Sequence, residues 1–257
     1  MVRKLWSFGC SWAAGTSLGT GTTSDELKNW YLTETGYDNY EDGIHNKLIN
    51  NTITVIDQEN ILRKWYIDTN GTKSAELSYA GRVANKLGLT LKSLAIPGTG
   101  NDRAYYNLQR CANIIDWDND LVLFDMCPEY RYMIDERNKK TDLQVALLED
   151  MSVANVIPSN TTLEILSSGI FSLINSKFNS DKVYPLVHFV NTNCGKNNLD
   201  LTNIHFTHTR FINDIGIEMH SKYWQYPSGH AVESVHDAFA DHILEDKFIA
   251  EYAKRHA

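Results

Sequence analysis

Leu5-Trp6-Ser7-Phe8-Gly9-Cys10-Ser11-Trp12-Ala13-Ala14-Gly15 is the stretch that decides the fold of this chain. It begins as a short apolar run and ends in a Gly-Cys-Ser turn, which predicts a buried strand that delivers Ser11 to the edge of a sheet. A serine on a tight strand-to-helix turn is one way to present a nucleophile. The stretch does not match the nucleophile elbow Gly-x-Ser-x-Gly of α/β-hydrolases, since Ala13 stands where the second glycine would be. From this stretch alone, a phosphate-binding or purely structural turn stays open beside the nucleophile.

The composition fits a globular protein with a sizeable core. The chain has 257 residues, 42% of them hydrophobic, which is enough for one large α/β domain or two small ones. Its net charge of −8 disfavours nucleic acid and anionic membranes as partners. No apolar run is long enough to span a membrane, and the apolar part of the N-terminus is too short for a signal peptide. We therefore expect no membrane partner and a cytoplasmic location.

The four cysteines are widely spaced and form no Cys-x-x-Cys motif. This pattern indicates free thiols in a reducing compartment rather than disulfides or a zinc site. His205-x-x-His208 has weak metal-ligand spacing and no clear third ligand, so we expect a solvated loop there, no metal and no cofactor.

Short apolar runs alternate with amphipathic segments along most of the chain. This alternation predicts an α/β fold with a parallel sheet covered by helices on both faces. We expect further strands over 91–96, 120–126 and 183–190, and helices over 76–87, 103–115, 163–178 and 231–252, with a weak helix at 143–151. Asn101 or Asp102 is the expected N-cap of the second helix. Residues 25–73 are irregular and rich in aromatics, with a hairpin turn expected at Asn70-Gly71; we interpret them as an insertion in a single domain, 1–257.

Three polar blocks follow a predicted strand or precede a predicted helix: Gly9-Cys10-Ser11, 97–101 and Ser228-Gly229-His230. In open parallel sheets, ligands bind at the carboxyl ends of the strands. A serine, a glycine-rich turn and a histidine gathered at that edge would supply a nucleophile, backbone donors and a base.

These blocks resemble those of the SGNH (GDSL-like) hydrolase superfamily. Phe8-Gly9-Cys10-Ser11-Trp12 is similar to the first block of a divergent branch that is common in phage and bacterial genomes. Residues 77–101 resemble the second block, and Gly229-His230 followed by Glu233, His236 and Phe239-Ala240 resembles the last. The resemblance covers both ends and the second block, and hardly touches 25–73 or 135–215.

The resemblance implies a flavodoxin-like three-layer fold and the hydrolysis of an ester, often an acyl or acetyl group on a lipid or sugar. Ser11 would be the nucleophile and His230 its general base, while the backbone N–H groups of Ser11 and Gly98 would hold the oxyanion. His230 would lie at the start of a helix, whose positive end lowers the pKa of an imidazole and keeps it neutral at pH 7. His236 is expected to be packed rather than catalytic, and Cys10 to be a small buried residue.

The chain departs from the family pattern at three places. Pro227 stands where the family has an Asp, so a backbone carbonyl or an acid such as Asp214, Glu218 or Glu233 would have to orient His230. The Gly-x-Asn-Asp block is missing, which leaves Asn101 as the nearest side chain to complete the oxyanion hole and Arg131 as a weaker candidate. The proline that usually follows the histidine is Ala231.

Two functions therefore stay open at the level of sequence. One is a serine esterase acting on acyl or acetyl groups, with a carbohydrate carrier favoured by the aromatic insertion. The other is a non-catalytic, phage-associated binding or structural protein that kept Ser11 and His230. A nucleotide-binding domain using 98–101 ranks below both, because the chain lacks the glycine fingerprints of such sites.

Overall fold

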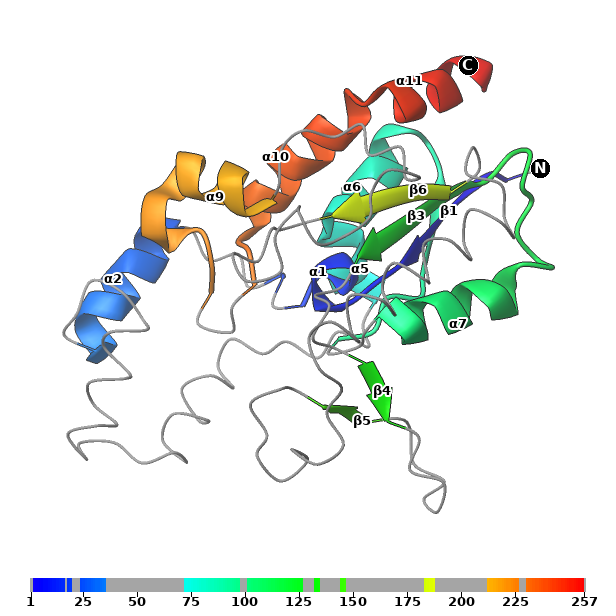
Figure 1. The fold of residues 1–257 in the computed structure, drawn as a ribbon. Helices are drawn as coiled ribbons and strands as arrows, with labels where there is room; N and C mark the ends of the chain where they lie inside the picture. The colour runs from blue at the N-terminus through cyan, green and yellow to red at the C-terminus, as the bar shows by residue number, and fades with distance from the viewer. Residues whose placement is uncertain are drawn as a thin grey trace.

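The computed structural model describes residues 2–16, 18–19, 24–35, 72–97, 101–126, 132–134, 144–146, 183–187, 212–226 and 230–256. Figure 1 shows the arrangement of their helices and strands. The strands are β1 (Lys4–Phe8), β2 (Thr90–Ser93), β3 (Leu121–Met126), β4 (Tyr132–Ile134), β5 (Gln144–Ala146) and β6 (Val183–Val187). The helices are α1 (Ser11–Ala14), α2 (Ser24–Thr35), α5 (Thr72–Leu77), α6 (Tyr79–Lys86), α7 (Asn101–Cys111), α9 (Ile212–His220), the 3-10 turn η3 (Ser221–Tyr223), α10 (Glu233–Leu244) and α11 (Lys247–Arg255).

β1 lies inside a parallel sheet of order β2-β1-β3-β6. Trp6 pairs in register with Lys92 of β2 on one side and Val122 of β3 on the other. Because these strands are parallel, their carboxyl ends meet at one edge of the sheet. β4 and β5 form a separate antiparallel pair.

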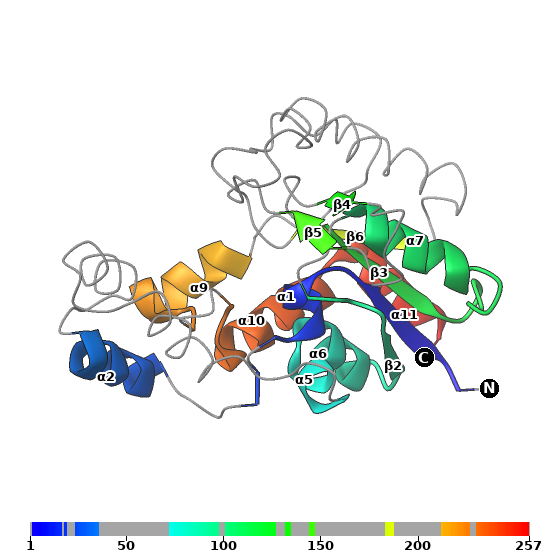
Figure 2. The ribbon, with the colours of Figure 1, turned by 90° about the horizontal axis from the view of Figure 1, so that it is seen from below.

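The two faces of the sheet bury different sets of side chains. Leu5, Leu121 and Leu123 pack with α6 and α10 in one apolar cluster. Trp6, Phe8 and their neighbours on β3 pack with α7 in a second cluster. Figures 1 and 2 show α7 on the face of the sheet opposite α6 and α10. The predicted α/β class, with a parallel sheet, is therefore confirmed. β1 and β3 are buried on both faces, and strands of this kind have nearly continuous apolar sequences.

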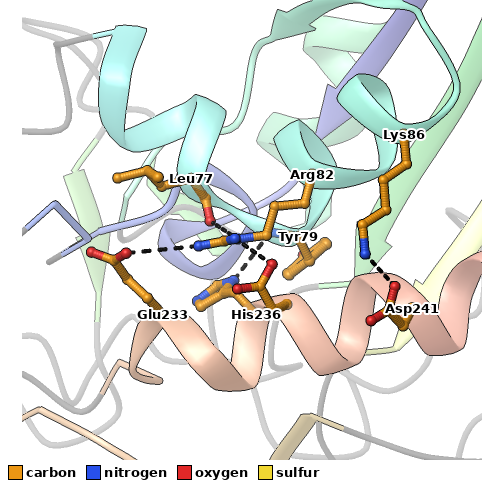
Figure 3. A network of polar contacts seen from close by, with 8 residues as sticks. Leu77, Tyr79, Arg82, Lys86, Glu233, His236 and Asp241 are labelled. Atoms are coloured by element: carbon orange, nitrogen blue, oxygen red, sulfur yellow. Dashed lines mark hydrogen bonds and ion pairs between the residues drawn. The ribbon is translucent and has the colours of Figure 1, made fainter. Parts of the chain in front are cut away.

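Helices α6 and α10 are also joined by ion pairs at the surface of the first cluster. The Arg82 guanidinium binds Asp237, and Lys86 binds Asp241 one turn further along both helices (Figure 3). Arg82 Nε donates to the carbonyl oxygen of Leu77 at 2.7 Å, which ties the end of α5 to the same side chain. These contacts set the position of α10 along α6.

Asp120 clamps the amino ends of β1 and β3 together. Its buried carboxylate accepts hydrogen bonds from Lys4 N and from the Trp6 indole Nε1, each at 2.8 Å, and from Asp116 N at 3.2 Å. Nearby, the Tyr252 hydroxyl of α11 donates to the carbonyl oxygen of Asn119 at 2.6 Å. The register of the central strands is thus held at the edge opposite the Gly-Cys-Ser turn.

Several predicted boundaries are wrong for identifiable reasons. The helix expected over 231–252 is divided, because the Asp246 side chain accepts from Phe248 N and caps a new helix. The helix over 76–87 is divided at Ser78, whose side chain accepts from Gly81 N. α6 ends at Lys86, and Gly88 follows it with φ of 64°. Asn101 begins α7 rather than capping it, and residues 144–146 form β5 where the weak helix was expected.

Other predictions fall on residues outside the described part of the chain. They are the hairpin at Asn70-Gly71, the helix over 163–178, the His205–His208 loop and most of the proposed insertion over 25–73. Within that insertion, α2 and the start of α5 are described.

We expect Asp120→Ala to destabilise the protein by about 2–3 kcal/mol, because it leaves the buried Trp6 indole N–H without its acceptor. Chemical denaturation monitored by circular dichroism measures this change. Glu245→Ala removes an exposed carboxylate and should leave stability within about 0.5 kcal/mol. Equal stability of the two variants would contradict the clamp.

Candidate functional site

The chain turns sharply at the carboxyl end of β1. Cys10 is the N-cap of α1, and Ser11 is the first residue of this single helical turn. Thr16 N donates to the carbonyl oxygen of Ser11 at 2.9 Å, and Gly15 ends the turn with φ of 73°. Ser11 thus occupies the strand-to-helix turn that the sequence predicts, with 5% of its surface exposed. Cys10 is fully buried, as expected, and is not part of a disulfide.

Gly9 is required at this turn because Asp125 leaves no room for a side chain. A Cβ on Gly9 would lie 2.7 Å from Asp125 Cβ, 2.9 Å from Asp125 Oδ2 and 3.1 Å from Ala13 Cβ. Asp125 belongs to the carboxyl end of β3 and is 1% exposed. A buried carboxylate therefore lies directly beside the turn that carries Ser11.

The segment after β2 continues along the same edge. Leu94 N donates to Ser7 O at 2.8 Å and Ile96 N to Gly9 O at 3.0 Å, so the chain follows β1 up to the turn. Asn101 then opens α7 with its side chain buried. Gly98, the expected second oxyanion donor, and Arg131 lie outside the described residues. The first and second blocks are thus neighbours in space.

His230 reaches this region from the other end of the chain. It lies in a short antiparallel pairing in which Tyr226 N donates to His230 O at 2.8 Å and Gln225 bridges to Ala231. Its imidazole centroid is 5.8 Å from the Trp12 ring, and Trp12 is 6.0 Å from Trp224. Because Trp12 follows Ser11 directly, the histidine segment meets the serine turn through this aromatic contact.

The three acids expected to orient His230 lie on two helices. Glu233 accepts from Gly19 N at 2.9 Å through Oε1, and its Oε2 is 3.7 Å from Arg82 (Figure 3). These contacts direct the Glu233 carboxylate toward α6 and the loop after α1. Asp214 and Glu218 are exposed on α9.

His236 has a structural environment. It is 1% exposed, its ring stacks on Tyr79 at 5.5 Å, and Nδ1 accepts from Tyr79 N at 3.2 Å (Figure 3). An acceptor at Nδ1 places the ring proton on Nε2 in the neutral form. This agrees with the expectation of a packed residue.

Sequence reasoning did not identify two other polar groups. One is Asp125, at the carboxyl end of β3. The other is a hydrogen-bonded pair, His220 Nε2 and Ser234 Oγ, 2.7 Å apart. Burial lowers the pKa of His220, and the negative charge of Asp25 partly offsets that effect. No motif spacing marks this pair, because it arises from the packing of α9 against α10.

The described residues contain no group of three or more His, Cys, Asp and Glu side chains placed to hold a metal ion. None of their helices is both long enough and apolar enough to cross a membrane.

Comparison with known protein families, with curated proteins and with solved structures finds no match to this chain.

We expect Gly9→Ala to destabilise the protein by about 1–3 kcal/mol, because its methyl group would collide with Asp125 and displace the turn. Thermal unfolding measures the change. Gly88→Ala isolates the cost of a left-handed φ without a collision, since its methyl meets no atom within 4 Å. A Gly9 variant as stable as the wild type would show that the turn does not need this close approach.

Proposed function

We propose that this protein is a serine ester hydrolase of SGNH type, with Ser11 as nucleophile and His230 as general base. The observation that carries the proposal is the contact between Trp12 and His230, which brings the histidine beside the residue that follows Ser11, at the carboxyl edge of a parallel sheet. Ligand sites of open α/β sheets lie at that edge.

The arrangement of the sheet supports a more specific fold within the α/β class. Parallel strands in the order β2-β1-β3-β6 follow the 2-1-3-4 order with which flavodoxin-like sheets begin. Helices α6 and α10 on one face and α7 on the other are what a three-layer arrangement requires. The proposed fold is therefore flavodoxin-like and three-layered.

In the proposed reaction, Ser11 Oγ attacks the ester carbonyl and its proton passes to His230. The C–O bond to the alcohol then breaks, and the alcohol leaves with that proton. Water hydrolyses the acyl group from Ser11 in the second half of the reaction. The N–H of Ser11, with Gly98 N–H and the Asn101 amide as the further candidates, would hold the negative oxygen. Hydrogen bonds between catalytic side chains often tighten only when substrate binds.

Asp125 is the candidate for the carboxyl group that the sequence lacks at Pro227. It lies at the same edge of the sheet, beside Gly9, where a charged carboxylate would stabilise the imidazolium that forms during attack. Glu233 is a weaker candidate, because its two oxygens already contact Gly19 and Arg82.

The proposed substrate is an acyl or acetyl ester on a carbohydrate. This part rests on the family resemblance and on the aromatic residues of 25–73, among them Trp30, Tyr31 and Trp65.

The alternative is a non-catalytic binding or structural protein with the same fold. The burial of Ser11, which is 5% exposed, favours this alternative, because a substrate has to reach a nucleophile.

We expect the wild-type protein to hydrolyse p-nitrophenyl acetate and to react with a fluorophosphonate probe at Ser11. Mass spectrometry should find the label on the tryptic peptide 5–28, which contains Ser11. Ser11→Ala should abolish that label, and His230→Gln should slow it by about 10²-fold or more, the contribution of a general base. His242→Gln serves as the matched control. A folded protein with no label on 5–28 and no turnover would favour the binding protein.

Asp125→Asn keeps the shape of the side chain and removes its charge. If this charge stabilises the imidazolium, kcat should fall by at least about tenfold while KM for the small ester changes little. Circular dichroism and thermal unfolding check that the fold is retained. An unchanged kcat would exclude the electrostatic role of Asp125.

A further inference from the structure

A second serine and histidine are already joined by a hydrogen bond elsewhere in the protein. His220 is the last residue of α9, and Ser234 is the second residue of α10. His220 Nε2 and Ser234 Oγ lie 2.7 Å apart, and both residues are half-buried. This distance is within the range that a nucleophile and its base require.

We propose that Ser234, with His220 as its base, is a second nucleophilic serine that reacts with activated esters and phosphonylating agents independently of Ser11. The hydrogen bond between the two side chains carries this assignment. It goes beyond the function proposed above, which uses neither residue.

The protonation state of His220 suits the role of a base. Burial is the larger influence and lowers its pKa below the ordinary value of 6.5, so the ring is neutral at pH 7. A neutral ring with its proton on Nδ1 can accept the Ser234 proton at Nε2. Asp25 on α2 favours the charged ring and so would stabilise the imidazolium that forms.

The helices that carry Asp25, His220 and Ser234 are linked to one another by packing contacts. α9 packs on α10 and on η3, and η3 packs on α2, where Lys28 Nζ lies 5.7 Å from the Tyr223 ring centroid. Gly216 of α9 approaches Trp224 so closely that a Cβ there would lie 2.5 Å from the indole. Rigid supports of this kind hold a reacting pair in one geometry.

The backbone next to His220 is in an uncommon conformation. Ser221 has φ of 53°, and it is the one non-glycine residue with positive φ in the described part of the chain. Such conformations cost about 1–3 kcal/mol and cluster at functional sites. Here the conformation ends α9 at His220.

The first turn of α10 offers backbone donors beside the hydroxyl. Its N-cap, Val232, has no side-chain hydrogen bond to the helix. No described residue accepts a hydrogen bond from the N–H groups of Glu233 and Ser234. N–H groups at a helix start stabilise negative charge, and here they would favour the negative oxygen that forms on the substrate when Ser234 attacks.

Ser234 and His220 can carry out the reaction with an ester without any further reactant. Ser234 Oγ forms a bond to the carbonyl carbon while its proton moves to His220 Nε2. The bond from that carbon to the leaving oxygen breaks, and the proton passes from His220 to the leaving alcohol. With a fluorophosphonate, the Oγ–P bond forms, the P–F bond breaks, and fluoride leaves with the proton.

The test is site-resolved labelling of the full chain with a fluorophosphonate. Ser234 lies on the tryptic peptide 223–247, separate from the peptide 5–28 that carries Ser11. Fragment ions distinguish Ser234 from Ser228 on the same peptide. We expect label on Ser234 in the wild type and in Ser11→Ala at the same rate, which separates this proposal from the one for Ser11.

His220→Gln should slow labelling of Ser234 by about 10²-fold or more, with His242→Gln unchanged. In the wild type the rate should fall only when the pH drops below 6.5, as His220 takes up a proton. Absence of label on Ser234 in the folded wild type would overturn the proposal. So would equal labelling of the native and urea-unfolded chains, or of the wild type and His220→Gln.

Discussion

The parallel pairing of β1 between β2 and β3 is the constraint on which the other features depend. It brings three carboxyl ends to one edge, where Ser11, Asp125 and the segment before Asn101 become neighbours. At the opposite edge, Asp120 fixes the register through buried hydrogen bonds to β1. A slip of one residue would exchange the two apolar faces, so the register is set by burial as well as by hydrogen bonding.

Much of the sheet could be predicted because its signal is local. β1, β3 and β6 are short apolar runs with polar or turn residues at their ends. Such runs are typical of buried strands at the centre of a sheet. The divisions of the C-terminal helix and of α5 from α6 were missed, because a capping Asp246 or Ser78 inside an apolar pattern resembles any polar residue on a helix surface. The roles of Asp120 and Asp125 depend on partners that only the folded chain supplies.

The candidate site also has a part that the sequence predicts and a part that depends on packing. Ser11 and the histidine segment were found from motif order, and the aromatic contact between Trp12 and His230 places them in one region. The partner of Glu233 could not be predicted, because it depends on how α6 and α10 pack side by side. The His220–Ser234 pair could not be predicted from the sequence either, since its two residues come from separate helices with no shared motif.

The attachment of α10 to α6 has a consequence for both serines. His230 lies just before this helix and Ser234 in its first turn, while the ion pairs of Arg82 and Lys86 hold the helix along its length. Any molecule whose binding shifts α10 would therefore alter the surroundings of His230 and of Ser234 together. By thermodynamic linkage, a ligand bound near one of these residues would change the affinity for a ligand near the other, and the factor is the same in either direction.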